Sequence, residues 1–133
     1  NVFLSDDKLN VSKAYMKPGL PFGGSCLVKD TKGLATKFDS TFFRNVIQTN
    51  DIHIDNIVKK LLVFNKIGIN GLSFKKGTND LRFSVGLLVA NKLIELGKDV
   101  LVFDPLVDYD KDFKFKLVSE DQLKSCDYTL NFH

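Results

Sequence analysis

Residues 66–104 have the sequence KIGINGLSFKKGTNDLRFSVGLLVANKLIELGKDVLVFD, and this stretch decides the fold. Its first nine residues, 66–74, are β-branched and apolar at alternate positions, which is typical of a strand. Apolar residues at helical spacing follow over 85–96, and Gly97 suits the position just after a helix end. Residues 99–104 predict a second apolar strand. Strand, helix and strand in this order predict a parallel α/β unit whose helix lies on a face of the sheet.

The flanking segments extend this pattern in both directions. Before the first strand, residues 40–64 predict a helix, because their apolar side chains recur at the spacing of one helix face. These side chains are Ile54, Ile57, Val58, Leu61 and Leu62. After the second strand, residues 119–125 predict a short helix and residues 127–132 a third strand. We therefore expect a helical segment followed by a parallel α/β domain, and the order of the strands stays open.

The composition is that of an ordinary folded protein, with 133 residues, 44% hydrophobic and 26% charged, and a net charge of +3. The basic residues form no cluster, so we expect no nucleic-acid partner. The apolar runs are too short to span a membrane and the first residues lack a secretory signal, so we expect a cytoplasmic protein. Cys26 and Cys126 have neither zinc-site nor disulfide-framework spacing, so we expect no metal and no disulfide.

The first segment suited to chemistry is PGLPFGGSCLVKD, residues 18–30. Its paired glycines allow a close backbone approach or a positive φ, and a thiol directly after such a turn can be exposed. Lys29 would favour the thiolate form of Cys26. Asp30, four residues beyond the thiol, shares a face with it if a helix begins here, and it could then orient a water. The alternative is that Cys26 is a buried, inert residue beside a flexible turn.

Two motifs resemble those of the UDP-glucose and GDP-mannose 6-dehydrogenase family. PFGGSCLVKD, residues 21–30, is similar to that family's active-site signature. GLSFKKGTNDLR, residues 71–82, is similar to its C-terminal strand and substrate loop. The two motifs occur in the family's order, and residues 15–19 and 75–80 are more similar to the GDP-mannose branch. The resemblance covers nearly the whole chain.

The resemblance implies an NAD-dependent oxidation of a sugar C6 alcohol to a carboxylate, through a thiohemiacetal and a thioester on a cysteine, in polysaccharide biosynthesis. A thiolate suits this role because it adds readily to an aldehyde and its acyl derivative still hydrolyses. Cys26 would be the nucleophile, Asp30 would help to activate water, and Lys29 would lie near the nicotinamide. GDP-mannose is the implied nucleotide sugar. Its implied contacts are Tyr15, Lys17, Phe22, Gly23, Phe74, Lys75 and Arg82.

The same residues also have a structural interpretation. From the pattern alone, Phe74, Lys75 and Lys76 are a strand end that enters a solvated charged turn, and Arg82 is a structural partner of Asp80. The chain also departs from the family. It has no G-x-G-x-x-G string for an NAD pyrophosphate, and Val28 and Val85 stand where the family has proline, although Ser84 can still cap the helix. Phe83 stands where a glutamate is common.

The resemblance also divides the chain. Residues 1–64 would be an active-site loop and part of a helical central domain that forms a dimer interface. Residues 65–133 would be part of a Rossmann-like nucleotide-sugar-binding domain. The partner would be a second copy or a chain that supplies the NAD domain, and we expect this chain alone to be inactive. The alternatives are a non-catalytic remnant that binds a nucleotide sugar, or a UDP-glucose 6-dehydrogenase fragment.

Overall fold

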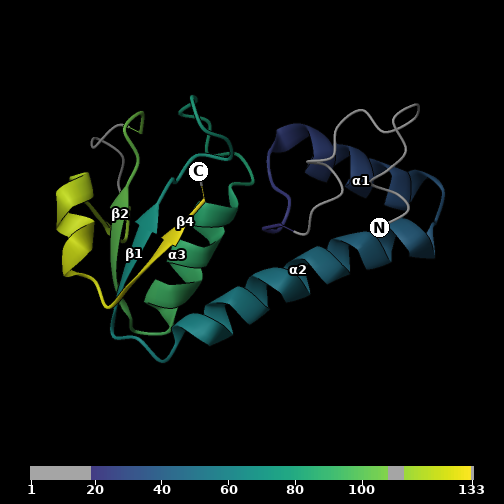
Figure 1. The fold of residues 1–133 in the computed structure, drawn as a ribbon. Helices are drawn as coiled ribbons and strands as arrows, with labels where there is room; N and C mark the ends of the chain where they lie inside the picture. Colours follow the sequence, from purple (N-terminus) through teal and green to yellow (C-terminus); the bar gives the residue numbers. More distant parts are fainter. Residues whose placement is uncertain (1–18, 108–112, 133) are drawn as a thin grey trace, which may run out of the picture.

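The computed structural model describes residues 19–107 and 113–132 (Figure 1). A pair of helices lies beside a parallel sheet, and the second helix of the pair runs from the first helix to the sheet. The elements are α1 (Ser25–Lys37), α2 (Thr41–Leu61), β1 (Lys66–Asn70), α3 (Val85–Glu95), β2 (Asp99–Phe103), β3 (Lys116–Leu117), the 3-10 helix η3 (Glu120–Ser125) and β4 (Tyr128–Asn131). The predicted α/β class is therefore confirmed. Tyr15 and Lys17 lie outside the described residues.

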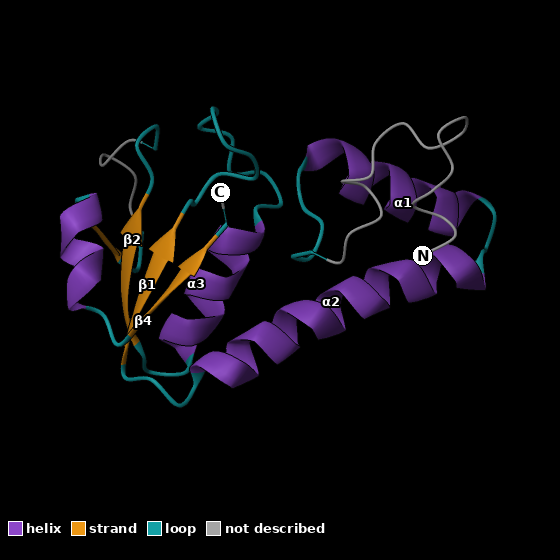
Figure 2. Ribbon diagram, in the orientation of Figure 1, coloured by secondary structure: helices purple, strands orange, loops and turns teal. Residues whose placement is uncertain are grey.

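The sheet has the strand order β3-β2-β1-β4, and each neighbouring pair is parallel (Figure 2). This order is that of the first four strands of the Rossmann fold, in which ligands bind outside the carboxyl ends of the strands, where the order reverses. The reversal lies at β1, because the chain continues from β1 to β2 and β3 and then returns to place β4 on the other side. The loops that follow the strands therefore lie at the edge suited to a ligand.

The predicted strand over 66–74 is too long. β1 ends at Asn70, because Gly71 has a φ of 94° and the backbone leaves the sheet there. β3 was not predicted, since its two residues are too few to show an alternation. The short helix at 119–125 is present as η3, and the Gln122 side chain accepts a hydrogen bond from the Ser119 N–H at 3.0 Å.

The ends of α3 are set by its sequence. The Ser84 hydroxyl accepts a hydrogen bond from the Leu87 N–H at 3.1 Å, which confirms the predicted cap without a proline at Val85. Gly97 has a φ of 77°, a conformation that glycine adopts without the steric cost paid by other residues. The predicted helix end is therefore also confirmed.

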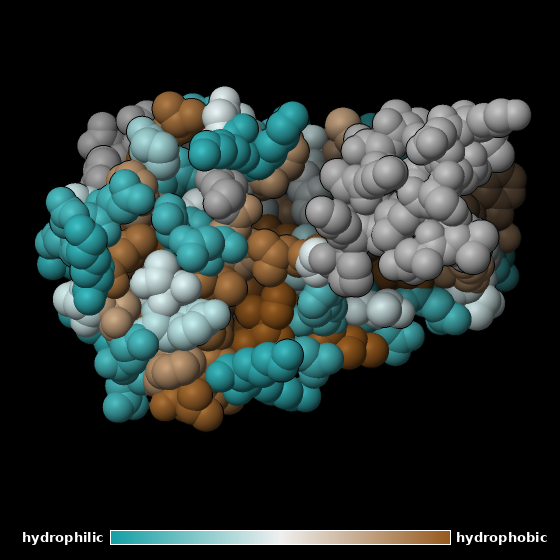
Figure 3. Space-filling view, viewed as in Figure 1, coloured by the Kyte–Doolittle hydropathy of each residue, from teal (hydrophilic) through white to brown (hydrophobic). Residues whose placement is uncertain are grey.

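One hydrophobic core joins the sheet to both neighbouring helices. Ile67 and Ile69 of β1 are fully buried with Val89 and Leu93 of α3. Each such side chain contributes about 1.5–3 kcal/mol when it is fully buried. The last turns of α2 add their own residues to the same core, namely Ile54, Val58 and Leu61. Figure 3 shows apolar surface where α2, α3 and β4 meet. In the described part of the chain, no helix has the length and apolar character that a bilayer crossing requires.

Candidate active site

The two motifs, distant in sequence, touch in the fold. The Gly24 N–H donates a hydrogen bond to the Phe83 carbonyl at 3.1 Å. A Cβ at Gly23 would lie 2.5 Å from that carbonyl oxygen, and a Cβ at Gly24 would lie 2.7 Å from the Phe74 ring. Gly24 also has a φ of 84°. The paired glycines are therefore required by the close approach of residues 74–83 to the start of α1.

Phe83 presents its carbonyl through an unusual backbone conformation. Its φ is 52°, in the left-handed region that a bulky residue seldom adopts. Such a conformation costs on the order of 1–3 kcal/mol and persists only where neighbouring contacts hold it. Here the Gly24 N–H binds the carbonyl, and the Lys32 ammonium lies 5.4 Å from the ring centroid. Phe83 thus connects α1 to the loop before α3.

A second contact holds the same turn from the side of α2. The Asn50 side chain accepts a hydrogen bond from the Phe22 N–H at 2.8 Å and donates one to the Phe22 carbonyl at 3.0 Å. This two-point contact fixes the backbone just before Gly23. Asn50 was not predicted as a site residue. The available signal was only a polar residue within a helical segment, which usually indicates an exposed position.

Cys26 is the second residue of α1 and is exposed. Its sulfur lies 4.0 Å from the Ser25 hydroxyl oxygen. A reagent or substrate can reach the thiol, so the alternative of a buried Cys26 is wrong. Cys126 differs, because it is half-buried and burial raises the pKa of its thiol.

Asp30 and Lys29 lie on the first turns of α1. The helix continues through Asp30, so Asp30 follows Cys26 at the i+4 position and lies on the same face. The Lys29 ammonium lies 3.4 Å from the Asp30 carboxylate, and both side chains are largely exposed. Such a surface ion pair contributes little to stability. Both groups remain accessible next to the thiol.

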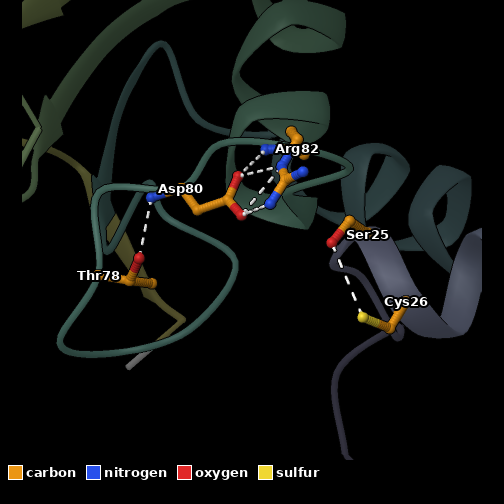
Figure 4. A network of polar contacts seen from close by, with 5 residues as sticks. All are labelled: Ser25, Cys26, Thr78, Asp80 and Arg82. Atoms are coloured by element: carbon orange, nitrogen blue, oxygen red, sulfur yellow. Dashed lines mark hydrogen bonds and ion pairs between the residues drawn. The ribbon is translucent and has the colours of Figure 1, made fainter.

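The Asp80–Arg82 pair lies on the loop that contacts the start of α1 (Figure 4). The Arg82 Nη2 donates to the Asp80 carboxylate at 2.7 Å, and the Asp80 N–H donates to the Thr78 hydroxyl at 3.1 Å. The hydrogen bond and the charge of Asp80 raise the pKa of Arg82. The structural partner expected for Arg82 is therefore present.

Phe74 and Lys75 are exposed beside this pair. The Phe74 ring packs against Gly24, and its N–H donates to the Asp80 carbonyl at 3.0 Å. The same loop borders a hollow at the carboxyl ends of β1 and β2. Its lining includes Asn70, Lys76, Gly77, Phe103, Pro105 and Glu120. The substrate contacts predicted for Phe74, Lys75 and Arg82 stay predictions.

Asp104 is a buried carboxylate at this edge that was not predicted as a site residue. Its Oδ2 accepts hydrogen bonds from the N–H groups of Leu72 and Ser73, both at 2.8 Å. Its Oδ1 accepts one from the Leu106 N–H at 3.0 Å. Burial favours the neutral acid, but these hydrogen bonds outweigh it and hold the pKa of Asp104 below its ordinary value. An acidic residue directly after an apolar strand and before a proline is the signal that could have found it.

Comparisons with known proteins place this architecture in a family. Residues 68–131 match the model of the UDP-glucose/GDP-mannose dehydrogenase family, UDP binding domain. The GDP-mannose 6-dehydrogenase of Pseudomonas syringae pv. tomato is 36% identical over 116 residues, which cover 82% of this chain. The chain belongs to the UDP-glucose/GDP-mannose dehydrogenase family. The resemblance predicted from the two motifs is confirmed.

Other relatives agree with this assignment. The UDP-glucose 6-dehydrogenase TuaD of Bacillus subtilis is 34% identical over 107 residues, 72% of this chain and 23% of the relative. A solved ternary complex of GDP-mannose dehydrogenase from Pseudomonas aeruginosa has a TM-score of 0.80 at 31% identity and covers 99% of this chain. The match spans 36% of the P. aeruginosa protein and 26% of the P. syringae relative. This chain therefore spans a limited part of the family members it matches.

The described residues do not fit the pyrophosphate of NAD. A dinucleotide site needs a glycine-rich turn whose amides, with the start of the next helix, bind the phosphates. The sequence has no G-x-G-x-x-G string. At the start of α3, the Leu87 N–H is already bonded to the Ser84 hydroxyl, and a Cβ at Gly86 would lie 2.6 Å from the Gly71 carbonyl oxygen.

In residues 19–107 and 113–132, no group of His, Cys, Asp or Glu is arranged to hold a metal ion.

Proposed function

We propose that this chain forms the thiol-bearing and nucleotide-sugar-binding part of an NAD-dependent GDP-mannose 6-dehydrogenase. One observation carries the proposal: an exposed cysteine follows a Gly-Gly turn against which a loop rich in cationic residues packs. A nucleotide sugar held by that loop would bring its sugar toward Cys26. The similarity to the GDP-mannose 6-dehydrogenases supports the choice of substrate.

Two chemical steps are assigned to residues of this chain. In the first, the Cys26 sulfur adds to the carbon of the C6 aldehyde, a C–S bond forms, and the former carbonyl oxygen takes up a proton. In the last, a water oxygen attacks the thioester carbon, the C–S bond breaks, and the sugar leaves as a carboxylate. Asp30 would take a proton from that water, because it lies one helical turn beyond the thiol. The intervening oxidation is assigned to no residue described.

The nucleotide part of the substrate would bind at the carboxyl edge of the sheet. Lys75, Lys76 and Arg82 place positive charge there, which suits the diphosphate of a nucleotide sugar. Phe74 offers a partly exposed ring, and 39% of its surface is accessible. Asp80 offsets part of the charge of Arg82 through their ion pair. Lys75 is therefore the stronger candidate for a phosphate contact.

Protection of Cys26 from alkylation tests the proposal. We expect GDP-mannose to slow the reaction of iodoacetamide with Cys26, and its 6-aldehyde to slow it further, because a thiohemiacetal removes the free thiol. Peptide mass spectrometry would report Cys26 and Cys126 separately. Lys75→Ala should remove the protection by GDP-mannose, while Lys124→Ala, which changes an exposed lysine on η3, should leave it unchanged. Equal alkylation with and without both ligands would contradict the proposal.

A second candidate is binding without catalysis, because the cationic loop of Lys75 and Lys76 suits a diphosphate whether or not the thiol reacts. The same experiment separates the two candidates. Protection by GDP-mannose that is no greater with the aldehyde would indicate a nucleotide-sugar-binding module. Stronger protection by the aldehyde, together with an aldehyde adduct that mass spectrometry detects on the parent chain and not on Cys26→Ser, would indicate a working nucleophile.

A further inference from the structure

A single buried side chain holds the turn that follows β1. The Asp104 Oδ2 accepts hydrogen bonds from the Leu72 N–H, the Ser73 N–H and, at 2.9 Å, the Ser73 hydroxyl. Only 3% of the Asp104 surface is accessible. β1 has ended at Asn70, so these backbone N–H groups no longer belong to the sheet ladder. Buried N–H groups need a partner, and here a carboxylate from the end of β2 supplies it.

Both ends of this turn are fixed. At its start, the Leu72 carbonyl accepts a hydrogen bond from the Ser84 hydroxyl at the cap of α3. At its end, the Ser73 hydroxyl lies 3.1 Å from the Lys75 carbonyl oxygen. The Ser73 hydroxyl has one hydrogen, which either the Asp104 carboxylate or the Lys75 carbonyl can accept. The carboxylate therefore reaches Lys75 through the backbone of Ser73 and Phe74, and Phe74 packs on Gly24. A shift of this turn would move the lysine and the contact at the start of α1 together.

We propose that Asp104 is a positioning residue of the nucleotide-sugar site, which fixes the turn over residues 71–75 so that Phe74 and Lys75 leave the sheet edge in one direction. Asp104 itself touches no substrate in this proposal and acts through the backbone of Ser73 and Lys75. The inference rests on the proposed function for the role of Lys75, whereas the turn itself can be tested without a ligand.

To fix the turn, residue 104 must be a carboxylate, and a side chain of the same shape is not enough. Both oxygens of Asp104 accept, Oδ2 from residues 72 and 73 and Oδ1 from the Leu106 N–H. An asparagine has nearly the same volume but only one accepting oxygen, and its amide group would place hydrogens toward a donor. Asp104→Asn should therefore release one side of the turn while it preserves the packing around it.

A double-mutant cycle with Lys75 tests the coupling. Binding of GDP-mannose to the full chain would be measured by calorimetry for the parent, Asp104→Asn, Lys75→Ala and the double variant. We expect Asp104→Asn to weaken binding by about tenfold, and to weaken it far less when Lys75 is already absent. Asp121→Asn on η3 is the matched control, because it removes an exposed carboxylate and should leave affinity unchanged. Equal losses in both backgrounds would show a general effect on the fold and overturn the proposal.

Amide resonances of the parent chain give a test that needs neither ligand nor variant. In an acid titration, the amides of Leu72 and Ser73 should shift with one midpoint, and those of Phe74 and Lys75 should follow it. Failure of Phe74 and Lys75 to follow would overturn the positioning role, even if Asp104→Asn does not fold. If the parent chain does not bind GDP-mannose while the amides of residues 72–75 still shift with one midpoint, the proposed function is rejected. Asp104 would still be the residue that fixes the turn.

Discussion

The two cysteines represent two regions of the molecule with different constraints. Cys26 is exposed at the start of α1, where backbone contacts hold the turn and leave the side chain accessible. Cys126 is half-buried next to β1, and a Cβ at Gly68 would lie 3.3 Å from its sulfur. The Cys26 thiol is therefore available for chemistry, whereas the Cys126 thiol serves packing. The difference in exposure comes from the position of each cysteine in the fold. Both cysteines have a lysine and an aspartate close by in the sequence, so the neighbouring charges do not explain it.

Thiol reactivity should show the largest difference between the two regions. We expect iodoacetamide to modify Cys26 more than about 100-fold faster than Cys126 in the folded chain, because Cys126 is shielded and burial raises the pKa of its thiol. Mass spectrometry of timed samples would give both rates. The rates should converge in denaturant. Comparable rates in the folded chain would remove the basis for separating the two regions.

A methyl group at Gly24 should have the next largest effect, because it would disturb the backbone contact that distinguishes the Cys26 region. Gly24→Ala combines a positive φ with a Cβ 2.7 Å from the Phe74 ring. We expect it to lower the free energy of unfolding by about 3 kcal/mol, measured by denaturant titration.

Gly33→Ala is the matched control within α1, since nothing lies within 4 Å of its Cβ position. Alanine is the better helix former, so this change should raise the free energy of unfolding by roughly 0.5–1 kcal/mol. A similar loss for both variants would show that the contact with Phe74 does not hold the turn.

The sequence predicted the elements better than the contacts between them. The periodicity from Val85 to Glu95 and the residues Ser84 and Gly97 defined α3 and its ends, because caps and helix faces are local properties. The Gly-Gly turn was recognised, but its cause was not, since Phe74 and Phe83 are distant in sequence. Asp104 was missed for the same reason: its partners are the N–H groups of residues 72, 73 and 106, which carry no sequence signal.

Low pH should have a smaller effect, and it should loosen the sheet edge before the start of α1. Among the described residues, Asp104 is the buried carboxylate, and it lies at the sheet edge rather than at the start of α1. Its pKa in the folded chain is lowered from the ordinary value of 3.8, so its contribution to stability is complete above 3.8 and is lost as pH falls through the folded value. Exchange of the Leu72 and Ser73 amides should therefore accelerate in acid before that of the Gly24 amide, after correction for intrinsic rates.

A variant of Asp104 tests whether its charge stabilises the turn. Asp104→Asn should lower the free energy of unfolding by about 2 kcal/mol at pH 7, because hydrogen bonds to a charged acceptor are stronger than those to an amide. This difference from the parent should shrink as pH falls below 3.8 through the folded pKa of Asp104, where the parent also loses the charge. Denaturant titrations of both chains across that range would measure it. A difference that stays constant with pH would mean that the shape of Asp104, rather than its charge, holds the turn.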